Sequence, residues 1–193
     1  MKRFTINELL KVMTEKNYKI FKDGSTNLIG IRSNNCRPNY FDDSFYDLRI
    51  DGTLKYYQIT TDPGKTCLIK PVNSKGCAIL KPGQYQGMWA VGKHKGKYPA
   101  LVQVKPCTVI RDANRDNKLD FDAKKEETGL FGINCHKARN GIISTLVNGW
   151  SAGCQVHAGS NRFDNEFMPD MKKAAVKYGN SFTYTLLVES DFV

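Results

Sequence analysis

Cys154 and His136 are the residues of this 193-residue chain whose types and spacing best suit chemistry. His136 closes a strand-like run at 130–136, and Cys154 follows 18 positions later, after the small residues Ala152 and Gly153. A cysteine attacks a carbonyl as its thiolate, and a neighbouring imidazole lowers the thiol pKa and carries protons. Small residues before the thiol leave backbone N–H groups uncovered, where they suit a developing oxyanion. The pair predicts an acyl-transfer centre.

The motif around these residues, Gly-Ile-x-x-His at 132–136 followed by Ser-x-Gly-Cys at 151–154, resembles the signature of the L,D-transpeptidase (YkuD-type) catalytic domain. The order of segments agrees over roughly residues 57–160, and the motifs themselves cover about 25 residues. The resemblance implies that His136 is the general base and Cys154 the nucleophile, with Ser151 and Gly153 shaping the oxyanion loop. It also implies a β-rich catalytic domain that cross-links or trims peptidoglycan stem peptides.

Two positions depart from the family pattern. Ala152 stands where the family usually has His, and Val156 where it usually has Asn or Arg. Other side chains would then orient the substrate. His94 lies in a Gly-flanked, charged segment that suits a substrate carboxylate, together with Lys93 or Arg162, although a surface histidine is the alternative. The candidates for substrate contact are His94, Gln155, Trp150 and Arg162.

A longer pattern includes Thr60-Thr61-Asp62-Pro63-Gly64 upstream and the segment 150–156 downstream, and it is similar to uncharacterised proteins of tailed bacteriophages. Three functions stay open at this point. The first is cysteine-dependent acyl transfer or hydrolysis on peptidoglycan through a Cys154 thioester. The second is a cysteine peptidase or amidase that acts on a protein. The third is a non-catalytic wall-binding or virion structural module, because cysteines are often buried in cores without any chemical role.

Alternating apolar residues and frequent Gly and Pro turns predict a mainly β fold. Strands are expected at 28–31, 46–50, 54–60, 67–72, 78–80, 88–91, 100–104, 108–110 and 182–188. Asp51-Gly52 is typical of a hairpin turn. Thr5 and Glu8 form a capping box before a helix that ends at Lys16, and Pro169 and Gly179 suit the first turn and the end of a second helix. We expect an antiparallel sandwich-like or barrel-like sheet of the L,D-transpeptidase type, flanked by N-terminal and C-terminal helices.

The length suits one domain, 1–193, because a chain of this size buries one sizeable core. Within it, residues 1–40 are expected to form an N-terminal helix and strand appendage, and 41–193 a β-rich catalytic domain. The sequence contains no apolar run long enough to span a membrane, and its N-terminus does not read as a signal peptide. We therefore expect synthesis in the cytoplasm, with release by lysis or association with a virion.

The net charge of +10 is spread along the chain and accompanies no nucleic-acid motif. A basic surface suits anionic envelope polymers, so peptidoglycan or another anionic polymer of the bacterial envelope is the expected partner, rather than specific nucleic acid. The six cysteines show no CxxC spacing, and reduced thiols are expected without an export signal.

The segment 112–120 has the oxygen-ligand spacing of a calcium loop at its positions 1, 3, 5 and 9. The candidate ligands are Asp112, Asn114, Asp116 and Asp120. The glutamate expected at position 12 is replaced by Ala123, and a polar loop held by Asx turns is the alternative interpretation. The proposed chemistry itself requires no cofactor.

Overall fold

A closed eight-stranded barrel forms the body of the computed structural model, which describes residues 2–35 and 37–192. Around the barrel the strands pair in the order β1 (Asn27–Arg32), β11 (Phe182–Val188), β5 (Gly83–His94), β6 (Tyr98–Gln103), β9 (Cys135–Lys137), β10 (Gln155–His157), β3 (Leu54–Thr60) and β2 (Asp43–Leu48). A second sheet joins β4 (Cys77–Leu80), β7 (Cys107–Asp112) and β8 (Glu126–Gly129). The expectation of a mainly β fold is confirmed.

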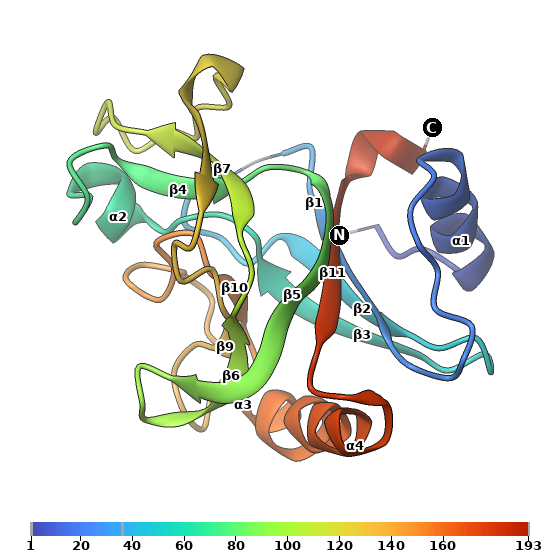
Figure 1. Cartoon of the computed structure of the whole chain (residues 1–193). Helices are drawn as coiled ribbons and strands as arrows, with labels where there is room; N and C mark the ends of the chain where they lie inside the picture. The colour runs from blue at the N-terminus through green and yellow to red at the C-terminus, as the bar shows by residue number, and fades with distance from the viewer. Residues whose placement is uncertain (1, 36, 193) are drawn as a thin grey trace.

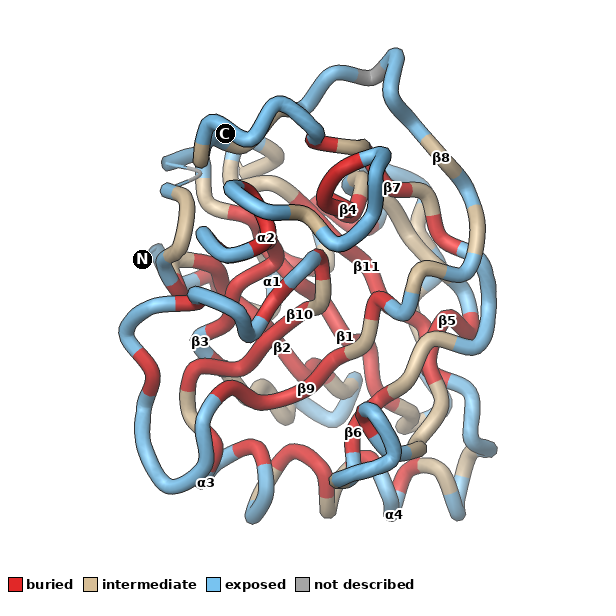
Figure 2. Tube along the Cα trace, turned by 90° about the vertical axis from the view of Figure 1, so that its left-hand side faces the viewer, coloured by how far each residue is buried: buried red, intermediate tan, exposed pale blue. Residues whose placement is uncertain are grey.

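Two strand pairs differ from the antiparallel sheet that we expected. β1 pairs with β11 in parallel, and β10 pairs with β9 in parallel. Parallel neighbours need a long connection, and the segment 138–154 supplies one between β9 and β10. Figure 2 shows these two strands buried, while the connection between them is largely exposed. Cys154 therefore lies at the end of a long, largely exposed connection.

The helix α1 (Ile6–Glu15) begins with the predicted capping box. Thr5 Oγ1 accepts from the Glu8 N–H at 3.3 Å, and Glu8 Oε2 accepts from the Thr5 N–H at 2.8 Å. Its buried face, which includes Leu9 and Met13, packs with residues of β1 and β2 on the outside of the barrel (Figure 1). Because β1 itself lies between β11 and β2, the strand of the expected 1–40 appendage is part of the barrel.

One helical run follows β10 and comprises α3 (Ser160–Arg162), the π-helical η2 (Phe163–Phe167) and α4 (Met168–Tyr178). Pro169 lies in the first turn of α4, and Gly179 ends it with a φ of 94°, as predicted. Figure 1 shows this run across one end of the barrel and the small sheet toward the other. Short 3₁₀ turns, η1 (Ala123–Lys125) and η3 (Glu189–Phe192), complete the elements described.

The expected strand at 67–72 is wrong, because residues 65–69 form the short helix α2 (Lys65–Ile69). A short apolar run does not by itself distinguish a strand from a helix. Here the backbone N–H groups at the start of α2 bind the segment before Cys154: the Thr66 N–H donates to Asn148 O at 3.3 Å, and the Gly64 N–H donates to Ser151 O at 2.9 Å. Tertiary hydrogen bonds thus outweigh the strand preference.

The main core fills the barrel and extends to both ends. Phe45, Trp89 and Tyr184 are fully buried inside it, and Phe163 and Phe167 of the helical run pack against them. Burial of each such side chain contributes roughly 1.5–3 kcal/mol relative to exposure. The Trp89 indole donates to Ile133 O at 2.7 Å, which fixes the chain two residues before β9. None of the described helices has the length and apolar character that a membrane span needs.

Candidate active site

Strands β9 and β10 bring Cys154 and His136 to the same side of the barrel wall. Val156 pairs with His136 in the parallel register, and the Gln155 N–H donates to Asn134 O at 2.9 Å. Side chains alternate along a strand, so Cys154 and His136 lie on one face. We call these two residues the outer pair. Tyr98 bonds His136, and burial, with a smaller contribution from Cys154, raises the pKa of its hydroxyl to about 12.

Contacts at Nδ1 hold the His136 imidazole in one orientation. Its Nδ1 lies 2.8 Å from the carbonyl oxygen of Lys137 and 3.1 Å from the hydroxyl of Tyr98. A carbonyl only accepts hydrogen bonds, so Nδ1 carries the proton and Nε2 the free lone pair. Nε2 is buried and bonds no atom of the described residues. The imidazole therefore presents a basic nitrogen that nothing in the described chain satisfies.

Burial keeps this imidazole neutral. His136 is 2% exposed, and desolvation, assisted by the neighbouring His94, lowers its pKa to about 3. The His94 ring stacks on it with centroids 3.9 Å apart, and the Asn134 amide lies 3.2 Å from the His94 Nδ1. Burial also lowers the pKa of His94. At neutral pH the site holds two stacked neutral imidazoles, one of which offers a base.

Cys154 does not bond His136 in this conformation. Its thiol donates to Gly132 O at 3.3 Å, and none of the hydrogen bonds within the described residues joins its sulfur to His136. The side chain is partly exposed, but the sulfur is desolvated, which raises the thiol pKa, while Lys95 acts in the opposite sense. Cys154 is therefore a protonated thiol that would have to turn from Gly132 to reach His136.

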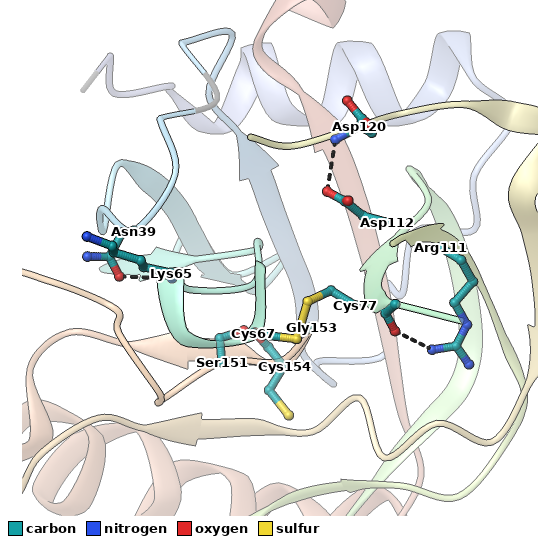
Figure 3. The surroundings of a disulfide bond; sticks show 11 residues. Asn39, Lys65, Cys67, Cys77, Arg111, Asp112, Asp120, Ser151, Gly153 and Cys154 are labelled. Carbon is teal, nitrogen blue, oxygen red and sulfur yellow. Dashed lines mark hydrogen bonds between the residues drawn. A yellow bond between two sulfur atoms is a disulfide. The ribbon is translucent and has the colours of Figure 1, made fainter. Parts of the chain in front are cut away.

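Ser151 and Gly153 shape the loop before the thiol (Figure 3). The Ser151 hydroxyl donates to Cys154 O at 2.9 Å and accepts from the Gly153 N–H at 3.1 Å. The Gly153 N–H is thus already used, contrary to its expected place in an oxyanion site. Within the described part of the chain, no acceptor bonds the Cys154 N–H, so it is the backbone donor beside the thiol that a ligand can use.

The position of Gly153 requires glycine. Its φ is 131°, a value that residues with a side chain rarely adopt. A Cβ built there would lie 2.0 Å from the carbonyl oxygen of Ala78 in β4. The glycine before the nucleophile therefore allows the loop to pack directly on the small sheet.

Gln155 supports the loop from inside the barrel and is fully buried, so the expected substrate contact does not fit its position. Its amide donates to Gly153 O at 3.2 Å, and its Oε1 accepts from the Tyr184 hydroxyl at 2.7 Å. A residue at an odd offset from Cys154 faces the core, which explains this placement.

Arg162 lies apart from the outer pair. It forms an ion pair with Glu166 at 2.8 Å, donates to Tyr56 O at 2.7 Å, and lines a groove of about 460 Å³ together with His157. His94 lies beside His136 but is itself buried, whereas Trp150 is 40% exposed just before the loop. Of the four candidates for substrate contact, Trp150 thus remains accessible near Cys154.

A second cysteine and histidine occupy the opposite face of the same strands. Cys135 Sγ lies 3.4 Å from His157 Nε2, inside the core, as the alternation along β9 predicts. We call these residues the inner pair. Phe45, Phe163 and Phe167 surround the imidazole. Burial raises the pKa of the Cys135 thiol well above its usual value and lowers that of His157 to about 3, so both groups are neutral.

The calcium-like segment binds its own polar groups. The Asp120 N–H donates to Asp112 Oδ2 at 3.2 Å, and the Asn114 amide donates to Asp120 Oδ2 at 2.6 Å. Asp116 accepts from the Lys118 N–H at 2.9 Å, which is an Asx turn. Among the described residues, no three His, Cys, Asp or Glu side chains are grouped to hold a metal ion. Calcium binding stays a prediction that these contacts do not favour.

The expectation of reduced cysteines is wrong for one pair, since Cys67 and Cys77 form a disulfide with their Cα atoms 6.0 Å apart. Their spacing matches no metal or redox motif, so no local pattern predicted this bond. Cys107 and Cys135 are free and buried, and Cys36 lies outside the described residues.

Tyr98, Asn134 and the Lys137 carbonyl are site groups that the sequence analysis missed. Tyr98 begins β6, which meets β9 through the pairing of Leu101 with Cys135, so its contact depends on a long-range register. Asn134 was open to prediction, because it lies two residues before His136 on the same face.

Comparison of the chain with family models, with curated proteins and with solved structures found no match.

Proposed function

We propose that the outer pair performs cysteine-dependent acyl transfer on a peptide substrate. The observation that carries this proposal is the state of His136: Nδ1 is fixed by the Lys137 carbonyl, and Nε2 is buried without a partner in the described chain, on the face that holds Cys154. A buried nitrogen without a hydrogen-bond partner costs folding free energy, and such atoms are frequent at functional sites. A base beside a partly exposed thiol is such a site, because it can take the thiol proton.

The mechanism starts when the Cys154 thiol turns from Gly132 toward His136. Because the pKa of His136 is about 3 and burial raises that of the Cys154 thiol, the resting pair stays neutral, and Nε2 accepts the thiol proton only as the sulfur attacks the substrate carbonyl carbon. The Cys154 N–H donates to the oxyanion, which is the interaction that most often dominates catalysis of this kind. The imidazolium, stabilised at Nδ1 by the Lys137 carbonyl and Tyr98, gives its proton to the leaving amine. A thioester on Cys154 remains.

The thioester then passes the acyl group to an amine, which is transpeptidation, or to water, which is hydrolysis. The motif resemblance assigns a peptidoglycan stem peptide as substrate, and the +10 charge suits an anionic envelope. Burial raises the pKa of the Cys154 thiol, and the positive charge of Lys95 partly offsets this effect. The motif resemblance and the net charge support the bacterial wall as the place of action.

The test is digestion of purified bacterial peptidoglycan by the wild-type protein, by Cys154→Ala and by Cys107→Ala, a matched removal of a buried free cysteine in β7. Muropeptides are identified by mass spectrometry. New cleaved or cross-linked species that vanish only with Cys154→Ala support the proposal and identify the bond. Identical muropeptide profiles with and without the wild-type protein refute a wall-peptide enzyme.

A non-catalytic wall-binding or virion module is the second candidate. The observation that favours it is the resting thiol, which bonds Gly132 and has a raised pKa. Sedimentation with insoluble peptidoglycan distinguishes a binding module from an enzyme. A binding module sediments equally well as the wild-type protein and as Cys154→Ala, and neither protein releases a product.

A further inference from the structure

The disulfide between Cys67 and Cys77 joins two segments that both hold the loop before Cys154. On one side, the Thr66 N–H next to Cys67 donates to Asn148 O at 3.3 Å. On the other side, the Ala78 N–H next to Cys77 donates to Ala152 O at 3.4 Å. The loop thus bonds an immediate chain neighbour of each cysteine.

Little besides the disulfide fixes these two segments to each other. The small cluster at this place contains Cys67, Leu68 and Cys77, with Leu119 packed against it. α2 is five residues long, far below the length at which a helix is stable alone. The residues 72–75 that connect the two cysteines are exposed, and Val72 is fully exposed. Loss of the S–S bond would leave α2 held mainly at its start, where Gly64 and Thr66 bond the loop and the Lys65 N–H donates to Asn39 Oδ1.

Cys67 and Cys77 are 8% and 2% exposed, and a hollow at the surface leads to them. This hollow of about 320 Å³ is lined by both cysteines and by Ala152 of the nucleophile loop. Figure 3 shows the Cys154 side chain with its sulfur directed away from the disulfide. Cys154 is a free thiol while Cys67 and Cys77 are joined.

We propose that the Cys67–Cys77 disulfide is a redox control of the nucleophile loop. The oxidised chain holds residues 148–153 in place. A dithiol reductant breaks the S–S bond, two thiols form on the protein, and the dithiol becomes a disulfide, so two electrons and two protons are transferred. The loop then loosens, and Gly153 leaves its close contact with Ala78. Acyl transfer is thereby confined to the oxidised chain, a statement that rests on the proposed function.

Hydrogen exchange measured by mass spectrometry tests this control without any substrate. The wild-type protein is compared before and after dithiothreitol, alongside Cys67→Ser/Cys77→Ser and the control Cys107→Ser. We expect peptides covering 148–154 to exchange at least about tenfold faster after reduction and in the double variant, whereas the buried β1 and β2 peptides keep their protection. Dithiothreitol should change nothing further in the double variant.

Unchanged exchange at 148–154 after complete reduction would overturn the proposal, and so would equal loss of protection in β1 and β2, because the disulfide would then maintain the whole fold. Muropeptide turnover by the double variant and by Cys107→Ser is measured in parallel. Loosened loops with no turnover by any protein would refute acyl transfer but not the redox control. Cys154-dependent turnover with unchanged exchange would refute the redox control alone.

Discussion

Strands β9 and β10 carry one cysteine and one histidine on each face, and the two pairs have opposite surroundings. The inner pair is in contact, with Cys135 Sγ 3.4 Å from His157 Nε2, but it is closed in by aromatic rings. In the outer pair, the thiol bonds Gly132 instead, yet it is partly exposed, and Nε2 of His136 is free among the described residues. Contact between a thiol and an imidazole therefore does not define an active site here.

Access and an unsatisfied base distinguish the two pairs. The inner imidazole uses Nε2 to bond the thiol and fills space between phenylalanines, as a core residue does. The outer imidazole leaves a buried nitrogen unpaired among the described residues. Other buried polar atoms, such as the Tyr57 hydroxyl oxygen, are unpaired as well, so what sets this nitrogen apart is its place on the face that holds a partly exposed thiol. The comparison teaches that an accessible thiol and an unpaired imidazole nitrogen mark a candidate catalytic pair as much as contact between the two groups does.

The largest expected difference concerns the two thiols. Cys154→Ala should reduce muropeptide turnover by at least about a thousandfold, because the nucleophile is removed. Cys135→Ala should leave turnover within about fivefold, and lower the free energy of unfolding by about 1 kcal/mol through the small cavity it creates. Kinetics and urea unfolding measure both. Equal losses of turnover in the two variants would remove the distinction between the pairs.

The two histidines sharpen the same comparison. His136→Gln should lower kcat by about a hundredfold or more, the usual loss for a general base, while His157→Gln keeps most of the turnover. Rate measurements at saturating substrate separate kcat from KM. If His157→Gln lowered kcat more than His136→Gln did, after correction for the folded fraction, the general base would belong to the inner pair and our assignment would be wrong.

Gly153 differs from glycines whose surroundings are open. Gly153→Ala should destabilise the protein by about 3 kcal/mol through backbone strain and the clash with Ala78 O. Gly141→Ala, also at a positive φ but with no atom within 4 Å of the added Cβ, should cost about 1 kcal/mol. Urea unfolding measures both losses of unfolding free energy, when one common dependence on urea concentration is fitted to all the variants. Similar losses of unfolding free energy in the two variants would mean that the loop shifts and relieves the clash with Ala78 O.

The histidines of both pairs should change the free energy of unfolding with pH in the same way. The pKa of His136 and of His157 is about 3 in the folded chain, against about 6.5 when unfolded, so the unfolded chain binds more protons between these values. The stabilisation is complete above pH 6.5 and is lost as the pH falls toward 3. At pH 5 each histidine should account for up to about 2 kcal/mol of that loss. Chemical unfolding from pH 8 to 4 should show a shallower slope for His157→Gln, and an unchanged slope would contradict its neutral burial.

Local patterns predicted much of this fold because they act within a few residues. The Thr5 and Glu8 capping box, the strand at 54–60 and the end of the last helix at Gly179 all appear as expected. Alternation along β9 also placed Cys135 opposite His136. Each of these features depends on neighbours in sequence.

Long-range contacts account for what the sequence did not reveal. The helix at 65–69 forms where the chain meets the loop before Cys154, and the disulfide closes between segments with no motif. Gln155 turned out to support the loop rather than face a substrate, and Gly153 gives its N–H to Ser151. The pairing of β6 with β9, which brings Tyr98 to His136, is likewise invisible to any local pattern.

The central claim is that Cys154 carries the acyl group, and trapping that thioester tests it most directly. The protein is incubated with purified muropeptides, quenched in acid, digested with pepsin and analysed by mass spectrometry. We predict an acyl mass increment on the peptide that contains Cys154, present in Cys135→Ala and absent in Cys154→Ala. Product formation without any adduct on Cys154, or an adduct on Cys135 instead, would contradict the assignment of the outer pair as the catalytic centre.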